Sequence, residues 1–120
     1  MGKPHKKLLV WQRSLALVKQ IYEETSGFPA EEKFGLVTQM RRAAISIPSN
    51  IAEGSARNTS KEFMNFLHIA QGSVAELETQ ILISQSLGFT TDDDMHPILN
   101  ELEEISRMII GLQKTLRGEK

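Results

Sequence analysis

The feature that most constrains the fold is an apolar residue at every third or fourth position, repeated along most of the chain. Near the C-terminus, for example, Ile98, Leu102, Ile105, Ile109 and Leu112 keep this spacing. An α-helix turns once every 3.6 residues, so the pattern places these side chains on one helical face. No two-residue alternation of the kind that marks a strand competes with it. The sequence therefore predicts an all-α fold.

Turn and capping residues divide this pattern into four helices, expected near 10–26, 31–53, 60–87 and 92–116. Gly27 and Gly88 are typical of positions that end a helix. Thr59 and Glu62 have the spacing of a capping box, in which side chains bind free amides at a helix start. Four helices with short connections predict a single domain, 1–120, folded as an up-down-up-down antiparallel four-helix bundle.

The spacing also assigns a buried face to the first two helices. In the second helix, Pro48 lies inside the pattern and predicts a kink, because proline removes a backbone hydrogen bond. Phe28 is expected to plug the first connection. The expected buried faces are Leu8, Trp11, Leu15, Val18, Tyr22 and Thr25 in the first helix, and Phe34, Val37, Met40, Ala44, Ile47 and Ile51 in the second.

The third helix is poor in charge. Between Phe63 and Leu87 its formal charges are Glu76 and Glu78, and the face turned away from the core carries small and neutral side chains. Such a surface lets another backbone approach at little desolvation cost, which favours a subunit interface. The alternative is a Gln- and Ser-rich face in contact with solvent. The interface residues expected are Gln71, Ala75, Thr79 and Leu82.

Composition narrows the function. The chain has no cysteine, which excludes disulfides, thiolate metal sites and cysteine nucleophiles and is typical of a reducing compartment. The apolar run after the basic N-terminus is too short for a signal peptide, and no segment is apolar over a membrane-spanning length. We therefore expect a cytoplasmic protein that does not contact a membrane.

Charge is segregated along the chain, because Lys and Arg predominate up to Lys61 and acidic residues predominate after it. This favours either an anionic partner or packing of one half against the other. The alternative for the basic residues is a solvated surface or pairing with Glu101, Glu103 and Glu104 across subunits, since aromatic residues that would stack on bases are sparse. The candidate RNA- or DNA-binding residues are Arg13, Lys19, Arg41, Arg57 and Lys61.

A set of polar residues in the second helix recurs at intervals of three and four. They share one helical face near Pro48. Two interpretations remain open: a polar pocket, or a network that satisfies carbonyl groups freed by the proline and sets the register of the bundle. In the network interpretation, Arg42 and Glu76 could pair between the second and third helices. The network residues are Gln39, Arg42, Ser46, Asn50, Glu53 and Glu76.

The sequence offers little for catalysis. Asp93 and His96 have the spacing of a metal-ligand pair, but a ferritin-like site needs a second such pair and further carboxylates. No nucleophile elbow or phosphate-binding loop is present. We expect no enzymatic activity, no metal and no cofactor; the alternative is a metal-binding or enzymatic four-helix bundle.

Several strings resemble a known family. These are the start at Leu9-Val-Trp-Gln, the stretch from Phe34 to Gly54 with its Ser-Ile-Pro-Ser-Asn-Ile-Ala-Glu-Gly string, and Ala70-Gln-Gly-Ser-Val-Ala-Glu-Leu-Glu-Thr-Gln. Over about residues 8–90 the chain resembles the bacterial four-helix-bundle family that includes the proteins encoded by intervening sequences in large-subunit ribosomal RNA genes.

This resemblance implies a bundle assembled as a ring-shaped homopentamer with no enzymatic activity. The chain is also similar to the accessory proteins of diversity-generating retroelements, which form such pentamers and bind nucleic acid and a reverse transcriptase. Those relatives are strongly basic, whereas this chain has a net charge of −1. The expected function is thus a non-catalytic oligomeric scaffold or adaptor, with RNA or DNA and a reverse transcriptase as candidate partners.

Overall fold

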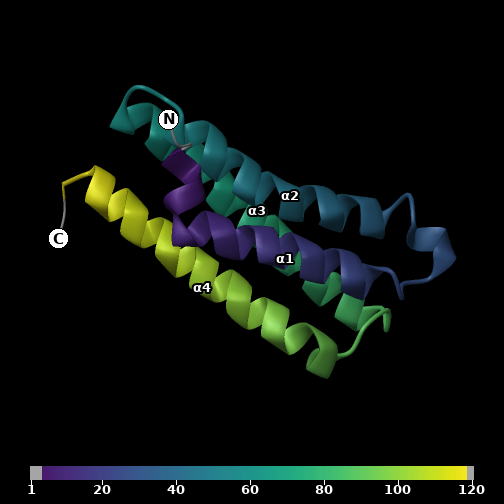
Figure 1. Cartoon of the computed structure of the whole chain (residues 1–120). Coiled ribbons are helices and arrows are strands. Elements are labelled where there is room, and N and C mark those ends of the chain that lie inside the picture. Colours follow the sequence, from purple (N-terminus) through teal and green to yellow (C-terminus); the bar gives the residue numbers. More distant parts are fainter. Residues whose placement is uncertain (1–3, 119–120) are drawn as a thin grey trace.

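The computed structural model describes residues 4–118, and in that range the chain forms α-helices and short 3-10 turns without a strand. Figure 1 shows the helices lying side by side and alternating in direction, with the start of α1 and the end of α4 at the end of the bundle that holds the α2–α3 connection. The molecule measures 44 × 27 × 19 Å. The predicted all-α four-helix bundle is confirmed. The elements are η1 (Pro4–Lys7), α1 (Leu9–Thr25), η2 (Ala30–Glu32), α2 (Leu36–Ser55), α3 (Ser60–Ser86) and α4 (Asp92–Leu116).

Side-chain caps begin the two longest helices. The amide of Glu62 donates to the Thr59 hydroxyl oxygen over 3.1 Å at the start of α3, and the amide of Asp94 donates to Thr91 over 3.1 Å at the start of α4. The Thr59 hydroxyl in turn donates to the Glu62 carboxylate at 3.0 Å. Each cap satisfies one amide that the helix leaves without a partner. The predicted start of the third helix at residue 60 is confirmed.

The predicted start of the second helix at residue 31 is wrong. Glu31 and Glu32 lie in the 3-10 turn η2, and Gly35 has a non-helical backbone with φ −112° and ψ −107°, so α2 begins at Leu36. Phe34 was expected in the core but is 88% exposed. The acidic pair was interpreted as the first turn of a helix, whereas the break at Gly35 separates it from α2 and turns Phe34 outward.

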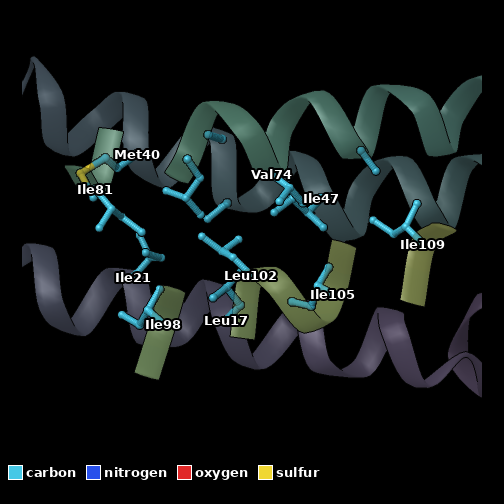
Figure 2. Close-up of a cluster of buried hydrophobic side chains, with 14 of the residues drawn as sticks. Leu17, Ile21, Met40, Ile47, Val74, Ile81, Ile98, Leu102, Ile105 and Ile109 are labelled. Carbon is cyan, nitrogen blue, oxygen red and sulfur yellow. The ribbon is translucent and has the colours of Figure 1, made fainter. Parts of the chain in front are cut away.

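The four helices share one aliphatic core, shown in Figure 2. Full burial of an aliphatic side chain of this size stabilises a fold by about 1.5–3 kcal/mol. The core therefore supplies the main driving force for bringing the helices together. Its fully buried large side chains are Leu17, Ile21, Met40, Ile47, Ile51, Leu67, Leu77, Ile81, Met95, Leu102, Ile105 and Ile109.

The predicted inner face of α1 is displaced from the observed one. Val10, Leu17 and Ile21 are buried, whereas Leu15 and Tyr22 are 44% and 40% exposed. Helix α1 has two apolar faces. The buried face contains Val10, Leu17 and Ile21, each of which lies one position before a residue of the predicted face. The expected stripe faces the gap between α1 and α2 instead, so its apolar surface is only partly covered.

The end of the bundle that contains the α1–α2 and α3–α4 connections is closed by two aromatic rings. Phe28 is buried, as predicted, and its ring lies 5.9 Å from the ring of Phe89. Gly88 has φ +78°, a backbone conformation that favours glycine, and it reverses the chain between α3 and Phe89. The two connections are thus held together by packing of their own aromatic residues.

Helices α2 and α3 approach each other closely at Gly54. A Cβ atom built there would lie 2.7 Å from Cδ1 of Phe63 and 2.7 Å from Cβ of Phe66. The glycine therefore allows α3 to fold back directly over the last turn of α2. Pro48 is buried inside α2, which continues through it to Ser55.

We expect Gly54→Ala to destabilise the fold by about 1–3 kcal/mol, because the added methyl group forces the two phenylalanines apart. Gly111→Ala is the matched control. That glycine is also inside a helix, but a Cβ atom there would meet nothing within 4 Å. The control should stabilise by about 0.5–1 kcal/mol through helix propensity. Chemical denaturation of both variants is the measurement, and equal effects would contradict the close approach.

Candidate interaction surfaces

Arg13, a candidate for nucleic-acid contact, is engaged within the chain. Its Nε donates to Oε2 of Glu101 over 2.8 Å, and its Nη2 donates to the other carboxylate oxygen. These hydrogen bonds and the negative charge of Glu101 raise the pKa of Arg13 above its ordinary value. The two-point contact joins α1 to α4. Pairing with Glu101 was the alternative considered across subunits, and the structure shows it within one subunit.

Arg41 is likewise committed to its own bundle. Its Nε donates to the Thr25 hydroxyl oxygen at 3.0 Å, and its Nη2 donates to the Tyr22 carbonyl oxygen at 3.3 Å. The guanidinium lies 4.3 Å from the centroid of the Tyr22 ring. A cation at this place stabilises the carbonyl end of α1. Arg41 therefore ties the last turn of α1 to α2.

The remaining basic candidates do not form one patch. Lys19 is exposed on α1, whereas Arg57 and Lys61 flank the α2–α3 connection. The guanidinium of Arg57 lies 4.8 Å from the Phe66 ring, and Lys61 and Arg117 line a shallow hollow with His68. Three further basic residues, missed from the sequence, lie at this end of the bundle. We call the whole set the basic end: Lys6, Arg57, Lys61, Lys114 and Arg117.

The opposite end of the bundle is acidic. It brings together the C-terminus of α1, the turn η2 and the N-terminus of α4, which carry Glu23, Glu24, Glu31, Glu32 and Asp92 to Asp94. Partial burial, together with the negative charges of Asp94 and Glu23, raises the pKa of Glu24. The sequence showed segregation between the two halves of the chain. The fold changes this into segregation between the two ends of the molecule.

The predicted polar network forms only around Ser46. The amide of Asn50 donates to the Ser46 carbonyl at 2.8 Å and to its hydroxyl oxygen at 2.9 Å, and the hydroxyl of Ser73 donates to that of Ser46 at 2.8 Å. This arrangement links α2 to α3 and supports the register interpretation over the pocket interpretation.

The other network residues lie outside this cluster. Gln39, Arg42 and Glu53 are exposed, and Glu76 accepts a hydrogen bond from Gln80 at 3.1 Å. Within residues 4–118 the ion pairs are Arg13–Glu101 and those of Arg107 with Glu103 and Glu104. The Arg42–Glu76 pair considered for this network is wrong, because Arg42 lies on the exposed side of α2 and its side chain extends into solvent.

Three of the four expected interface residues, Ala75, Thr79 and Leu82, are exposed on α3. Gln71 is half-buried instead: its Nε2 donates to the Ser106 carbonyl at 3.2 Å, and its Oε1 accepts from the Ser106 hydroxyl at 3.0 Å. It therefore holds α3 to α4. We define the α3 outer face by its exposed small and apolar residues: Ile69, Gly72, Ala75, Thr79, Leu82 and Ile83.

A groove between α1 and α2 was missed by the sequence reasoning. The displaced stripe of α1 forms one wall, α2 forms the other, and the hollow has a volume of about 280 Å³. Towards the acidic end it continues past Ile45 to Tyr22, Thr38, Arg41 and Arg42. The signal was present as a second apolar stripe in α1. We call this surface the α1–α2 groove, and define it by Trp11, Leu15, Val18, Ile45, Pro48 and Ala52.

The structure also places the predicted metal-ligand pair. Asp93 and His96 lie exposed in the first turns of α4, where His96 contacts the Asn100 amide at 3.2 Å. In the part of the chain that the structure describes, no three His, Asp or Glu side chains gather closely enough to hold a metal ion. No helix in that part is both long and apolar enough to span a membrane.

These features define a small four-helix bundle whose distinctive parts are surfaces. The sequence profile described as 23S rRNA-intervening sequence protein matches residues 6–111. The chain belongs to this family. It is similar to a crystal structure from Bacteroides thetaiotaomicron, described as a protein with unknown function from the S23 ribosomal protein family. The TM-score is 0.79 at 25% identity, over 88% of this chain and 99% of the other. No curated protein matches the sequence.

The Arg13–Glu101 pair should contribute measurably to stability. In a double-mutant cycle with Arg13→Gln and Glu101→Gln, we expect a coupling of about 1 kcal/mol, because the contact is two-pointed and partly shielded from water. The exposed Arg107–Glu103 pair serves as the control and should couple by about 0.5 kcal/mol or less. Urea unfolding of each variant gives both values; a larger coupling for the exposed pair would contradict this assignment.

The raised pKa of Glu24 predicts how stability depends on pH. A carboxylate whose pKa is higher in the folded than in the unfolded state destabilises the fold once ionised, and protonation removes this cost. Glu24→Gln should therefore raise the melting temperature at pH 7, and the gain should shrink as the pH falls through the Glu24 pKa. Glu53→Gln, at the other end of the bundle, should give no such gain. A pH-independent gain for Glu24→Gln would argue against charge as its cause.

Proposed function

We propose that the protein is a non-catalytic homo-oligomeric scaffold that binds nucleic acid through the basic end. The observation that carries the proposal is the amount of apolar surface that one chain leaves uncovered. Ile69 and Leu82 on α3 are each 51% exposed, and Leu15 and Ile45 beside the α1–α2 groove are more than 40% exposed. Large apolar side chains that gather on particular faces of a small protein in this way favour an interaction site.

A ring-shaped homopentamer is the assembly proposed. The number five rests on the resemblance to pentameric bundles, and the structure supports the premise that one chain alone is incomplete. In any closed ring, equivalent residues of the copies lie on a circle around the symmetry axis. The basic ends would then form a continuous band of positive charge, although a single copy offers only a modest patch. Repetition converts several weak phosphate contacts into appreciable binding.

The structure changes the residues proposed for nucleic-acid contact. Arg13 and Arg41 are engaged by Glu101 and by Tyr22 and Thr25, so their donors are directed inside the bundle. Arg57, Lys61 and Lys114 are exposed at the basic end. These three side chains are the proposed phosphate contacts. A reverse transcriptase stays a proposed protein partner on the strength of the resemblance.

Light scattering on the purified protein tests the assembly. We expect a mass near five times the 13.5 kDa of one chain. Ala75→Lys should reduce this mass while leaving the helical circular-dichroism signal unchanged, because it introduces a charge on the α3 outer face. A wild-type mass of one chain at micromolar concentration would contradict the proposal.

The proposed nucleic-acid binding is tested by measuring binding to structured RNA and to duplex DNA across a range of salt concentrations. The wild type should bind with an affinity that falls steeply with salt. Arg57→Ala and Lys61→Ala should each weaken binding and reduce the slope of log affinity against log salt by about 0.9 for every copy in the ring that contacts the duplex. Lys33→Ala, at the acidic end, is the matched control and should change neither. Salt-independent binding, or equal losses for all three variants, would count against the basic end.

A further inference from the structure

We infer that the α1–α2 groove is the docking site for the α3 outer face of a second copy of this chain. The inference rests on the proposed oligomer and specifies its interface: each subunit presents the groove on one side and the helix that fills the next groove on another. The sequence predicted an interface on α3, and the α1–α2 groove supplies the surface that would receive it.

The groove has the chemistry of a site for an apolar helix. Trp11, Leu15 and Val18 form the α1 wall, and Ile45, Pro48 and Ala52 form the α2 wall. These side chains are apolar, and Pro48 is buried at the base of the α2 wall. The groove runs from Trp11 to Tyr22 on α1, about 16 Å at the rise of a helix.

The α3 outer face has a matching shape. Gly72, Ala75 and Thr79 carry small side chains, and the space beside Gly72 is open. Small residues of this kind let a helix approach a neighbouring surface closely. Ile69, Leu82 and Ile83 project beside them, each more than 40% exposed. The span from Ile69 to Ile83 is about 21 Å, comparable with the length of the groove.

Charge selects this pairing over the two symmetric ones. Arg41 and Arg42 border the groove, and Arg42 has no hydrogen bond or ion pair within residues 4–118. The exposed acids Glu76 and Glu78 flank the α3 outer face. Two grooves face to face would bring arginines together, and two α3 faces would bring glutamates together. When the groove of one copy meets the α3 outer face of another, the arginines of the first lie beside the glutamates of the second.

One subunit can present both surfaces at once. Helix α2 packs directly beside both α1 and α3, and α1 and α3 lie diagonally across the bundle. The groove lies between α1 and α2, whereas the α3 outer face is on the exposed side of α3. Because the two surfaces differ, the contact between copies is heterologous. It closes into a ring when the rotation between successive copies divides a full turn, and the proposed pentamer requires this closure.

Cysteine cross-linking tests the inference, because the natural chain contains no cysteine. Single cysteines are placed in the groove (Leu15→Cys or Ile45→Cys) and on α3 (Ala75→Cys or Thr79→Cys). All four positions are exposed, so the fold should tolerate them, and unchanged thermal melting confirms this. Groove and α3 variants are co-expressed in each of the four combinations and then oxidised.

We expect a covalent dimer in at least one groove-plus-α3 combination, and little or none when any variant is expressed alone. A dimer that forms with one groove variant alone, or one α3 variant alone, would overturn the inference in favour of a symmetric contact. An oligomeric mass without any groove-to-α3 cross-link would also overturn it, while leaving the scaffold proposal intact. A mass of one chain would contradict the scaffold and the docking site together.

Discussion

The rest of the structure depends on the packing of one aliphatic face from each of the four helices into a shared core. The helices are 17 to 27 residues long, and most of the stability of such helices in proteins comes from packing of an amphipathic face, because nucleation of a helix is costly. Burial of Leu17, Ile47, Ile81 and Leu102 between the helices supplies what the individual segments lack. Caps and turns such as Thr59 and Gly88 set where each helix begins and ends, but they contribute less than the core.

The core does not bury all of the apolar residues. It contains one apolar face from each helix, whereas α1 has a second apolar face and α3 also has apolar residues outside its buried face. The surplus appears in the α1–α2 groove and on the α3 outer face, where Leu15, Ile45, Ile69 and Leu82 remain 42–51% exposed. Assembly of identical chains would bury this surplus, so the packing within one subunit and the contact between subunits have a common origin.

The sequence predicted the helices well wherever local chemistry decides the outcome. The start of α3 follows from the Thr59 cap, and its end follows from Gly88, because both depend on neighbouring backbone groups. The predicted start of α2 was wrong, because Glu31 and Glu32 suit the first turn of a 3-10 segment as well as that of an α-helix. Only the backbone break at Gly35 distinguishes the two cases.

Surfaces were harder to predict than helices, because they depend on which faces meet. Periodicity cannot decide which of two apolar stripes in α1 enters the core, so the α1–α2 groove was missed. Pairing also depends on distant residues: Arg13 lies beside Glu101, 88 positions away, and Gln71 lies beside Ser106. Two of the five residues of the basic end were predicted. Lys6, Lys114 and Arg117 were missed, because they join Arg57 through the direction of the helices and not through sequence proximity.

The central claim is that a single chain leaves apolar surface that only a second copy covers. The most direct measurement is the melting temperature over a wide concentration range, from about 1 to about 100 μM, followed by circular dichroism. Folding coupled to assembly predicts that the melting temperature rises with concentration, because association stabilises the folded chain by mass action. A melting temperature that stays constant over this range, with a mass of one chain throughout, would show that the monomer is complete and would contradict the account.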